Sequence, residues 1–467
     1  MRHVSTLYKK FKDGKVHYYW SMVENVRVGR RVFQRQALYL GELNDSQREE
    51  WQRAVEAFDE KGNVRQLKLF PEDRAPETDD GQVVRIRMDR LTVRNVRNWG
   101  EVWLGREMWD KLGLDGFWTP RLGASRKGTD WLALMKAIVL YRFTDPGSEL
   151  RMHTNWIANT AVGELIGPGA LTGRSTLYSC LDRVIWNSDE WKKPRGERKG
   201  SFKDEFFCFL RDRWAGLFGS TCDVVLFDLT STYFEVDGTK ALESDLQRYG
   251  YSRDRRGDCL QVVVALVLTP DGFPLAYEVM PGNTSDKETS MRAKRIRSAM
   301  KKLFKLDERI REARANDEGT YLLRTNLPEC DPKTLWRRYM IQGEIEYAFR
   351  ELKNGLGLRP VYHSLDDRIE AHIFTAFMAL CLLQTLRAIA REHAPGLTPR
   401  QIIDNFRTVK MVDVVMPTTD GRIVTLPRYV EPKPDLMILL DRLGLTLPVQ
   451  PPPKISSEAA ESAKTTV

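Results

Sequence analysis

The sequence predicts a protein of the α/β class, because it contains both strand patterns and strong helical patterns. The strand patterns concentrate between residues 222 and 280, where apolar runs are bounded by turn residues. Helical spacing is strongest over residues 131–141 and 368–392. A chain of 467 residues is too long for one ordinary core, so we expect about three domains.

The composition is that of a soluble protein with a small excess of positive charge. A hydrophobic content of 42% is enough for packed cores, and a charged content of 29% is ordinary. The net charge is +9, from 73 basic and 64 acidic side chains, and the pI is near 9.1. These values permit nucleic-acid binding, but a mildly basic soluble enzyme fits them equally well.

The sequence predicts a location in the cytoplasm. Its six cysteines lie far apart with no C-x-x-C pair, which argues against a structural zinc site or a disulfide scaffold and fits a reducing compartment. The N-terminal residues lack the apolar region of a signal peptide. The longest apolar stretch, 373–389, is interrupted by Thr375, Gln384 and Arg387, so we expect a buried helix and not a membrane span.

Residues 1–70 predict a basic, β-rich unit followed by a helix. Alternation over 16–20 and 31–40 is typical of strands, and Ser46 and Glu49 have the spacing of a capping box. Aromatic and basic side chains interleave in this unit, which suits a DNA-contacting arm, although a solvated strand face explains the same pattern. The acidic segment 71–83, which contains two prolines, is predicted to be a linker.

Residues 84–204 predict a helical, DNA-binding domain. A strong helix over 131–141 should end before Asp145-Pro146-Gly147, and a short helix should begin near Leu171 and carry Arg174. Short capped helices of this kind fit a helix-turn-helix, but the same spacing serves any helical packing unit.

Residues 205–395 carry the predicted sheet. Strands are expected over 224–227, 260–268 and 273–280, and the last two should form a hairpin around Asp271-Gly272. A further strand is expected over 321–325. Beyond this region, residues 396–448 predict a C-terminal extension with a hairpin around Asp420-Gly421 and a helix over 436–443, and residues 449–467 a disordered tail.

Asp228 is the first candidate site residue, because it follows the apolar run 224–227 directly. A carboxylate at the end of such a strand suits a hard cation such as Mg²⁺, which prefers oxygen ligands. Two such ions, bridged by shared carboxylates, activate a water or a 3′-hydroxyl and stabilise the leaving oxygen of a phosphodiester. The alternative is that Asp228 caps a turn over residues 229–232.

The second candidate group lies on a helix predicted over 339–353. Helical spacing places five polar side chains on one face: Tyr339, Gln342, Glu346, Arg350 and Lys353. Glu346 could bind metal while Tyr339, Arg350 and Lys353 hold DNA phosphates. The alternative is an exposed helix with an ordinary Glu346–Arg350 ion pair. His363 and His372 lie nearby, and we expect both to be packing or hydrogen-bonding residues.

Taken together, these residues resemble the DDE transposases of bacterial insertion sequences, within the insertion sequence 4 superfamily. The resemblance covers about residues 15–448. It is carried by the sequences DLTSTYF at 228–234, YGYSRD at 249–254, PGNTSD at 281–286 and RPVYH at 359–363. Tyr339, Glu346 and Lys353 match the Y-R-E-K signature of this group. The present chain has Gln342 at the position of the signature's arginine.

The resemblance implies an RNase H-like catalytic core with a mixed sheet within residues 205–395, which uses Mg²⁺ or Mn²⁺ to cut and join DNA during transposition. Asp228 matches the first catalytic aspartate and Glu346 the catalytic glutamate, so both would also be metal ligands. The implied partners are double-stranded DNA, at transposon ends and at the target, and a second copy of the chain in a homodimer.

The chain departs from the family where the second catalytic aspartate is expected. The available acids are Asp286, Asp307 and Asp317, and none of them follows an apolar strand. We interpret this as an internal deletion around residues 287–295 that removed a core strand and one metal ligand. The expectation is therefore a transposase by descent that is catalytically impaired. The alternative is a non-catalytic, DNA-binding remnant, and an unrelated metal-dependent hydrolase would need a third acid near Asp228.

Overall fold

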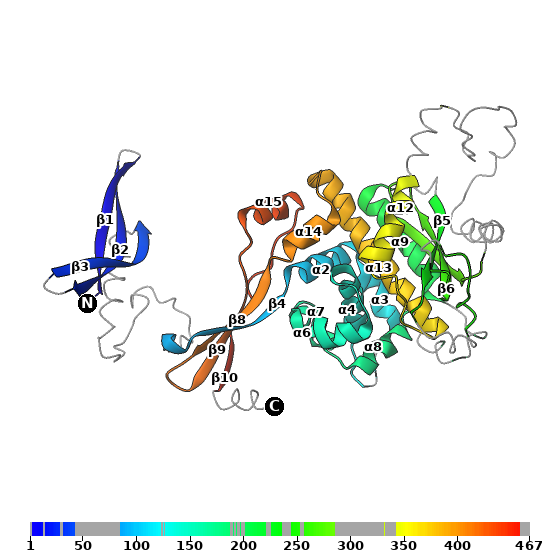
Figure 1. Cartoon of the computed structure of the whole chain (residues 1–467), viewed down its shortest axis with the longest axis horizontal. Coiled ribbons are helices and arrows are strands. Elements are labelled where there is room, and N and C mark those ends of the chain that lie inside the picture. The colour runs from blue at the N-terminus through cyan, green and yellow to red at the C-terminus, as the bar shows by residue number, and fades with distance from the viewer. Residues whose placement is uncertain are drawn as a thin grey trace. The chain divides into compact units, whose positions relative to one another are not determined.

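The chain forms two compact units, Met1–Arg85 and Ile86–Val467. The boundary falls just after the predicted linker 71–83, which itself lies outside the described residues. The structure is a computed structural model, shown in Figure 1. It describes residues 2–12, 15–28, 31–42, 85–122, 125, 127–186, 190, 193, 197, 201–220, 226–235, 244–252, 256–284, 331 and 342–457.

The smaller unit contains a three-stranded antiparallel sheet in the order β1-β2-β3. Its strands are β1 (Arg2–Lys12), β2 (Lys15–Val28) and β3 (Arg31–Glu42). Lys12 pairs with Lys15 and Val28 with Arg31, so only two residues of sequence separate consecutive strands. The predicted strands over 16–20 and 31–40 are confirmed, and the helix predicted after Ser46 lies outside the described residues.

Helices dominate the first part of the larger unit (Figure 1). After the 3₁₀ turn η2 (Met88–Arg90) and β4 (Thr92–Asn98) come α2 (Gly100–Leu112), α3 (Leu114–Leu122), α4 (Trp131–Thr144), α5 (Glu149–Arg151), η3 (Met152–Trp156), α6 (Ile157–Asn159), α7 (Val162–Ile166), η4 (Pro168–Ala170), α8 (Arg174–Leu181) and α9 (Phe202–Phe218). The predicted helix over 131–141 is α4, and Asp130 caps it by accepting the Ala133 N–H at 2.9 Å. The short helix predicted near Leu171 is α8, which buries Leu177 against the core and leaves Arg174 exposed. A DNA-reading role for α8 stays a prediction.

A second antiparallel sheet has the order β5-β6-β7. Its strands are β5 (Leu226–Tyr233), β6 (Gln261–Leu268) and β7 (Pro274–Pro281). Every residue of the central strand β6 is buried, which explains its continuous apolar sequence. The predicted hairpin is confirmed, and Gly272 in its turn has a φ of 90°, a conformation that favours glycine. The mixed sheet that the resemblance implied is antiparallel across the described strands, and the strand predicted over 321–325 lies outside them.

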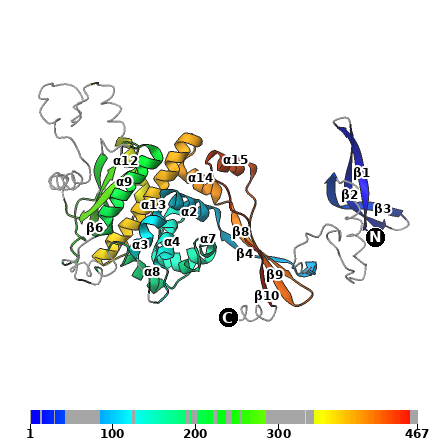
Figure 2. The same ribbon diagram turned by 180° about the vertical axis from the view of Figure 1, so that it is seen from behind.

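The long helix α13 (Asp366–His393) is the centre of the larger unit. It packs against α2, α4 and β7, and both views show it beside α9 and the β5-β6-β7 sheet (Figure 1, Figure 2). By length and composition α13 could cross a membrane, but 89% of its most apolar window is buried inside the protein. This is the burial of a core helix, and it confirms the buried helix expected over 373–389.

Aromatic side chains connect α13 to its neighbours. Phe374 contacts Trp118 of α3, with ring centroids 5.8 Å apart, and Phe206 of α9 at 5.4 Å. One turn later, Phe377 contacts Tyr277 of β7 at 4.9 Å. Because these rings are buried, the sheet and the helices share one apolar core.

The C-terminal elements form a third sheet with a strand from the start of the unit. They are α14 (Pro399–Phe406), β8 (Lys410–Pro417), β9 (Arg422–Tyr429), α15 (Pro434–Arg442) and β10 (Lys454–Ser457), and the sheet order is β10-β9-β8-β4. The hairpin around Asp420-Gly421 and the helix over 436–443 are confirmed. β4, from the region predicted to be helical, pairs with β8, so regions 84–204 and 396–448 share one sheet.

The start of the predicted disordered tail is ordered, and the prediction is wrong for residues 449–457. β10 pairs with β9, and Gln450 exchanges two hydrogen bonds with the backbone of Tyr429, at 3.1 and 3.0 Å. The Pro451 carbonyl also accepts a hydrogen bond from Arg428 at 2.6 Å. The exposed edge of β9 supplies backbone partners that a local reading of a proline-rich segment does not reveal.

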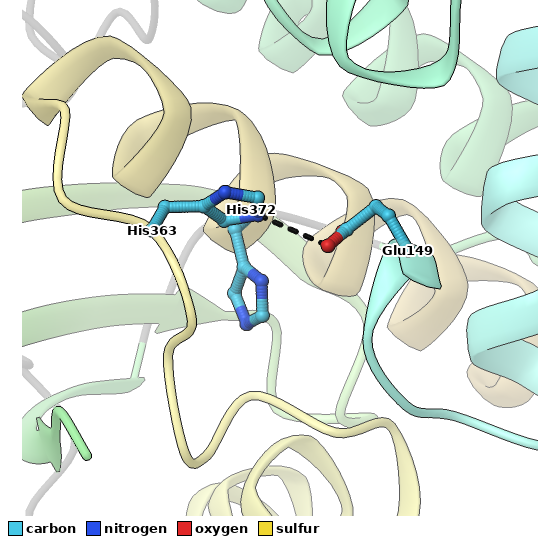
Figure 3. Close-up of side chains that lie close together, drawn as sticks. All are labelled: Glu149, His363 and His372. Carbon is cyan, nitrogen blue, oxygen red and sulfur yellow. Dashed lines mark ion pairs between the residues drawn. The ribbon is translucent and has the colours of Figure 1, made fainter. Parts of the chain in front are cut away.

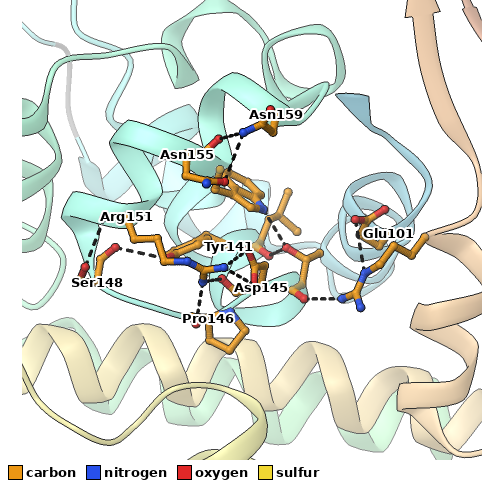
Figure 4. A network of polar contacts seen from close by, with 12 residues as sticks. Glu101, Tyr141, Asp145, Pro146, Ser148, Arg151, Asn155 and Asn159 are labelled. Carbon is orange, nitrogen blue, oxygen red and sulfur yellow. Dashed lines mark hydrogen bonds and ion pairs between the residues drawn. The ribbon is translucent and has the colours of Figure 1, made fainter. Parts of the chain in front are cut away.

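A polar network joins α2, α4 and α5 to the end of α14 (Figure 4). Arg151 pairs with Asp145 at 2.8 Å, and the Thr144 carbonyl accepts a hydrogen bond from Arg407 at 2.8 Å. Arg407 also lies 3.7 Å from Glu101, a residue that is only 2% exposed. Burial raises the pKa of the Glu101 carboxyl, although Lys410 and Arg407 pull the pKa down.

We predict that Glu101→Gln stabilises the larger unit at neutral pH. Because the folded-state pKa of Glu101 is raised, its favourable contribution is complete below the ordinary value of 4.5 and is lost as the pH rises. Gln mimics the protonated carboxyl. Urea unfolding at about pH 8 should therefore give a higher free energy of unfolding for the variant, and the difference should shrink at about pH 4.

Glu392→Gln serves as the control, because its side chain is 73% exposed on α13. This control should leave stability unchanged at both pH values. Lower stability of Glu101→Gln at the higher pH would contradict the prediction.

Candidate functional site

Asp228 is the third residue of β5 and pairs with Leu266 of β6. The apolar run stops at Asp228, but the strand continues to Tyr233 because Thr230 and Thr232 pair along the buried strand β6. Two expectations are therefore wrong: Asp228 does not end the strand, and it does not cap a turn over 229–232. The carboxylate instead stands within a strand, half-buried.

The face of β5 that carries Asp228 is the face that the helices cover. Side chains alternate along a strand, so Asp228, Thr230 and Thr232 share one face with their partners on β6. Those partners are Leu266, Val264 and Val262, which all belong to the main core with α9 and α13. Asp228 therefore points toward the helical side of the sheet.

Glu346 lies on α12 (Gln342–Arg350), an amphipathic helix. Ile345, Ala348 and Phe349 are buried at helical spacing, whereas Gln342, Glu346 and Arg350 are exposed. The exposed face agrees with the alternative of an exposed helix, although within the described part of the chain Glu346 forms no ion pair with Arg350. The Arg350 guanidinium lies over the Tyr347 ring at 5.3 Å instead.

The predicted polar face of this helix is confirmed only in part. Gln342, Glu346 and Arg350 are exposed together, but Tyr339 lies outside the described residues. Lys353 is half-buried within the π-helical turn η8 (Glu351–Gly355), which follows α12 directly. A π turn widens the helix, so Lys353 does not keep the angular position that ideal α-helical spacing assigns to it.

The two acidic elements lie side by side, because α12 packs against β5. The chain after η8 also joins the end of β5: Thr232 Oγ1 donates to the Leu358 carbonyl at 3.2 Å, and the Val361 N–H donates to the Tyr233 carbonyl at 3.1 Å. The structure thus brings together the strand of Asp228 and the helix of Glu346. Asp286, Asp307, Asp317 and the predicted deletion around 287–295 all lie outside the described residues.

Glu344 fixes the first turn of α12 to α13. Its carboxylate pairs with Arg387 and, at 2.7 Å, with Arg391. Arg391 also donates to the Asp271 carbonyl at 3.2 Å, in the turn between β6 and β7. Arg387 covers the Tyr347 ring at 3.8 Å. Sequence reasoning missed this contact, because its members are more than forty residues apart and the helix pattern shows only that Glu344 is polar.

A second polar cluster is fully buried between α4, α5 and α13 (Figure 3). It contains Glu149, His363 and His372, whose ligand atoms lie within 4.8 Å of one another. His363 Nε2 is 3.3 Å from Glu149 Oε2, although the contact is not aligned as a hydrogen bond. The expectation that both histidines are packing or hydrogen-bonding residues agrees with this arrangement.

Arg142 makes this cluster a poor metal site. Its Nη2 atom lies 3.0 Å from Glu149 Oε1 and 2.9 Å from His372 Nδ1, so a guanidinium cation already contacts two of the three candidate ligands. An arginine stays protonated, and its donors occupy the lone pairs that a metal would need. Histidine nitrogens also do not suit Mg²⁺, which prefers oxygen.

The protonation states of the cluster follow from these contacts. Burial alone raises the pKa of Glu149, but His363 and Arg142 outweigh it, and the pKa lies well below its ordinary value. Burial and Arg142 lower the pKa of His372 well below 6.5, so its ring is neutral. Since Arg142 donates to Nδ1, the proton of His372 is on Nε2, which donates to the Leu358 carbonyl at 3.3 Å.

The chain matches no protein-family model, no curated protein and no solved structure.

We predict that Glu149→Gln destabilises the larger unit by ~3–5 kcal/mol at neutral pH, because it leaves Arg142 buried without a counter-ion. The folded-state pKa of Glu149 is lowered, so its contribution is present above the ordinary value of 4.5 and is lost as the pH falls below it. Chemical unfolding from neutral to acidic pH should show wild type and variant converging in acid.

The comparison with Glu101→Gln tests the sign of the stability change. Both variants remove a buried carboxylate, but their expected effects on the free energy of unfolding are opposite at neutral pH. Equal unfolding free energies for Glu149→Gln and wild type at neutral pH would show that the ion pair has no net effect on stability.

Proposed function

We propose that the larger unit contains an RNase H-like core of DDE-transposase descent that binds double-stranded DNA. The observation that carries the proposal is the packing of the Glu346 helix against the Asp228 strand. Two separate sequence motifs that resemble the first and last parts of one active site thus lie on adjoining elements. The strand order β5-β6-β7, with Asp228 on the outer strand of the three, agrees with the beginning of such a core.

We propose that Asp228 and Glu346 are the protein's ligands for Mg²⁺ or Mn²⁺. Both residues offer carboxylate oxygens, which suit hard divalent cations, and Glu346 is exposed on α12. When bound, such ions supply an activated water or 3′-hydroxyl and stabilise the leaving oxygen of a phosphodiester. The buried group of Glu149 and two histidines does not fit this role, because Arg142 contacts its ligand atoms.

DNA would contact the same side of α12. Arg350 is exposed one turn after Glu346, and Lys353 and Tyr339 are the further candidates from the sequence signature. The net charge of +9 favours association with a polyanion. The proposed setting is the cytoplasm, with transposon-end and target DNA as partners and a homodimer as the assembly.

The same proposal includes impaired catalysis. A two-metal site depends on a shared set of carboxylates, and the sequence has no strand-borne acid between Asp286 and Tyr321. Loss of one ligand should lower the rate by orders of magnitude. The second candidate function, a non-catalytic DNA-binding remnant, is favoured by that same gap in the sequence.

We predict that the protein binds Mn²⁺ and that Asp228→Asn or Glu346→Gln weakens the affinity about tenfold or more, because each removes a charged oxygen ligand. Electron paramagnetic resonance titration of free Mn²⁺ measures this directly. Asp212→Asn and Glu392→Gln are matched controls, since their side chains are 67% and 73% exposed on α9 and α13.

Cleavage of a duplex carrying the element's ends is the second measurement, with expected activity weak or absent. Robust cleavage that disappears in Asp228→Ala and Glu346→Ala would overturn the proposed impairment. The remnant is indicated if DNA binding is equal with and without Mg²⁺ and Mn²⁺ binding does not depend on the two acids. A protein that binds neither Mn²⁺ nor DNA has neither function.

For the DNA surface, we predict that Arg350→Gln and Lys353→Gln each reduce the slope of log affinity against log salt by about 1, because each removes one phosphate contact. Fluorescence anisotropy with a labelled duplex over a range of NaCl concentrations measures the slope. Arg442→Gln, an exposed change on α15, is the control. Slopes identical to wild type in both variants would exclude these side chains from the DNA surface.

A further inference from the structure

We infer that Arg142 is a positioning residue: it holds residues 357–361 against β5 and so sets where α12 lies relative to Asp228. The consequence for the metal site rests on the proposed function of Asp228 and Glu346. The placement of the segment does not, and it follows from contacts that connect α4, α13 and β5.

Arg142 makes three hydrogen bonds from one buried guanidinium. Nη1 donates to the Gly357 carbonyl at 2.9 Å, and Nη2 contacts Glu149 Oε1 at 3.0 Å and His372 Nδ1 at 2.9 Å. The residue is 1% exposed. A guanidinium can meet three acceptors in fixed directions, which the single ammonium of a lysine does not reproduce. The segment after η8 is therefore tied to α4 by a buried charge.

The next link is the carbonyl of Leu358. It accepts from His372 Nε2 at 3.3 Å and from Thr232 Oγ1 of β5 at 3.2 Å. One backbone oxygen thus connects the strand of Asp228 to the histidine that Arg142 orients. Three residues later, Val361 N–H donates to the Tyr233 carbonyl at 3.1 Å and closes the segment onto the end of β5.

Gly357 allows the close approach that this arrangement needs. Its φ is 65°, in the left-handed region that side chains rarely adopt. A Cβ atom there would lie 2.8 Å from the Pro146 Cβ and 3.4 Å from Arg142 Nη1. The segment is held by hydrogen bonds on one side and by steric contact with the 145–147 turn on the other.

The position of residues 357–361 affects the candidate site, because the segment begins only two residues after the end of η8. Asp228 lies four residues before Thr232 on the same face of β5, a span of about 13 Å. A shift of residues 357–361 along β5 therefore carries the end of α12, and Glu346 with it, past Asp228. Arg142 touches neither acid and acts through the segment.

The first experiment measures hydrogen exchange of the Val361 and Leu358 amides in the full chain. Thr232→Val removes the hydrogen bond to the Leu358 carbonyl with little change in side-chain volume. Arg142→Lys replaces the forked guanidinium by a single ammonium group. We expect about three- to tenfold faster exchange at Val361 in Thr232→Val, and more in Arg142→Lys, with β6 amides unchanged. Thr385→Val is the matched control, because that buried threonine bonds the Cys381 carbonyl of its own helix.

If Arg142→Lys fails to fold, Thr232→Val still tests the inference, because this variant leaves every buried charge in place. His372→Gln and His372→Leu form a further pair: Gln retains an acceptor and a donor and should restore part of the protection that Leu loses. Unchanged Val361 exchange in Thr232→Val and in His372→Leu overturns the inference.

The second experiment repeats the Mn²⁺ titration on the same variants, since a purely structural role would not change metal affinity. Weaker Mn²⁺ binding in Thr232→Val, with Thr385→Val unchanged, supports the positioning role. Faster exchange with unchanged Mn²⁺ affinity overturns the link to the site. If wild type shows no Mn²⁺ binding that depends on Asp228 and Glu346, the proposed function fails, and the exchange measurement alone decides whether Arg142 positions the segment.

Discussion

The burial of α13 is the constraint on which the larger unit depends. This helix is apolar on nearly all sides, and water would solvate it poorly, so α2, α4, α8, α14 and β7 must cover it. Elements from distant parts of the sequence therefore pack against the same helix. Two of the polar clusters described above lie where an element packs against α13: Glu344 pairs with its last turns, and His372 enters the Arg142 cluster from its first turns.

Local sequence patterns predicted those parts of the fold whose stability is itself local or whose burial is complete. α4 and α13 were predictable because long apolar helices leave a continuous pattern, and the β6–β7 hairpin because an Asp-Gly turn separates two apolar runs. β4 was missed because its residues are mostly exposed and its partner strand lies more than three hundred residues away. β10 was missed because only the edge of β9 makes it a strand.

The same distinction applies to the candidate site. Asp228 and Glu346 were found because each stands beside an apolar pattern, a strand in one case and a helical stripe in the other. Arg142 and Glu149 were missed. Two partners of the arginine, Gly357 and His372, lie 215 and 230 residues away in sequence, and Glu149 lies in the separate short helix α5. A usable signal did exist: Arg142 lies near the end of a helix in which Lys136 is the other charged residue, and burial of such a cation requires acceptors from elsewhere.

The sheet β10-β9-β8-β4 has a consequence for how the protein is made. Thr92 of β4 pairs with Val415 of β8, so this early strand lacks its neighbour in the sheet until the ribosome has added more than three hundred further residues. During that interval β4 presents an unpaired edge that other chains can join. This unit should therefore fold with less aggregation where nascent chains are kept apart from one another. Its folding should also be slow, because contacts so distant in sequence form late.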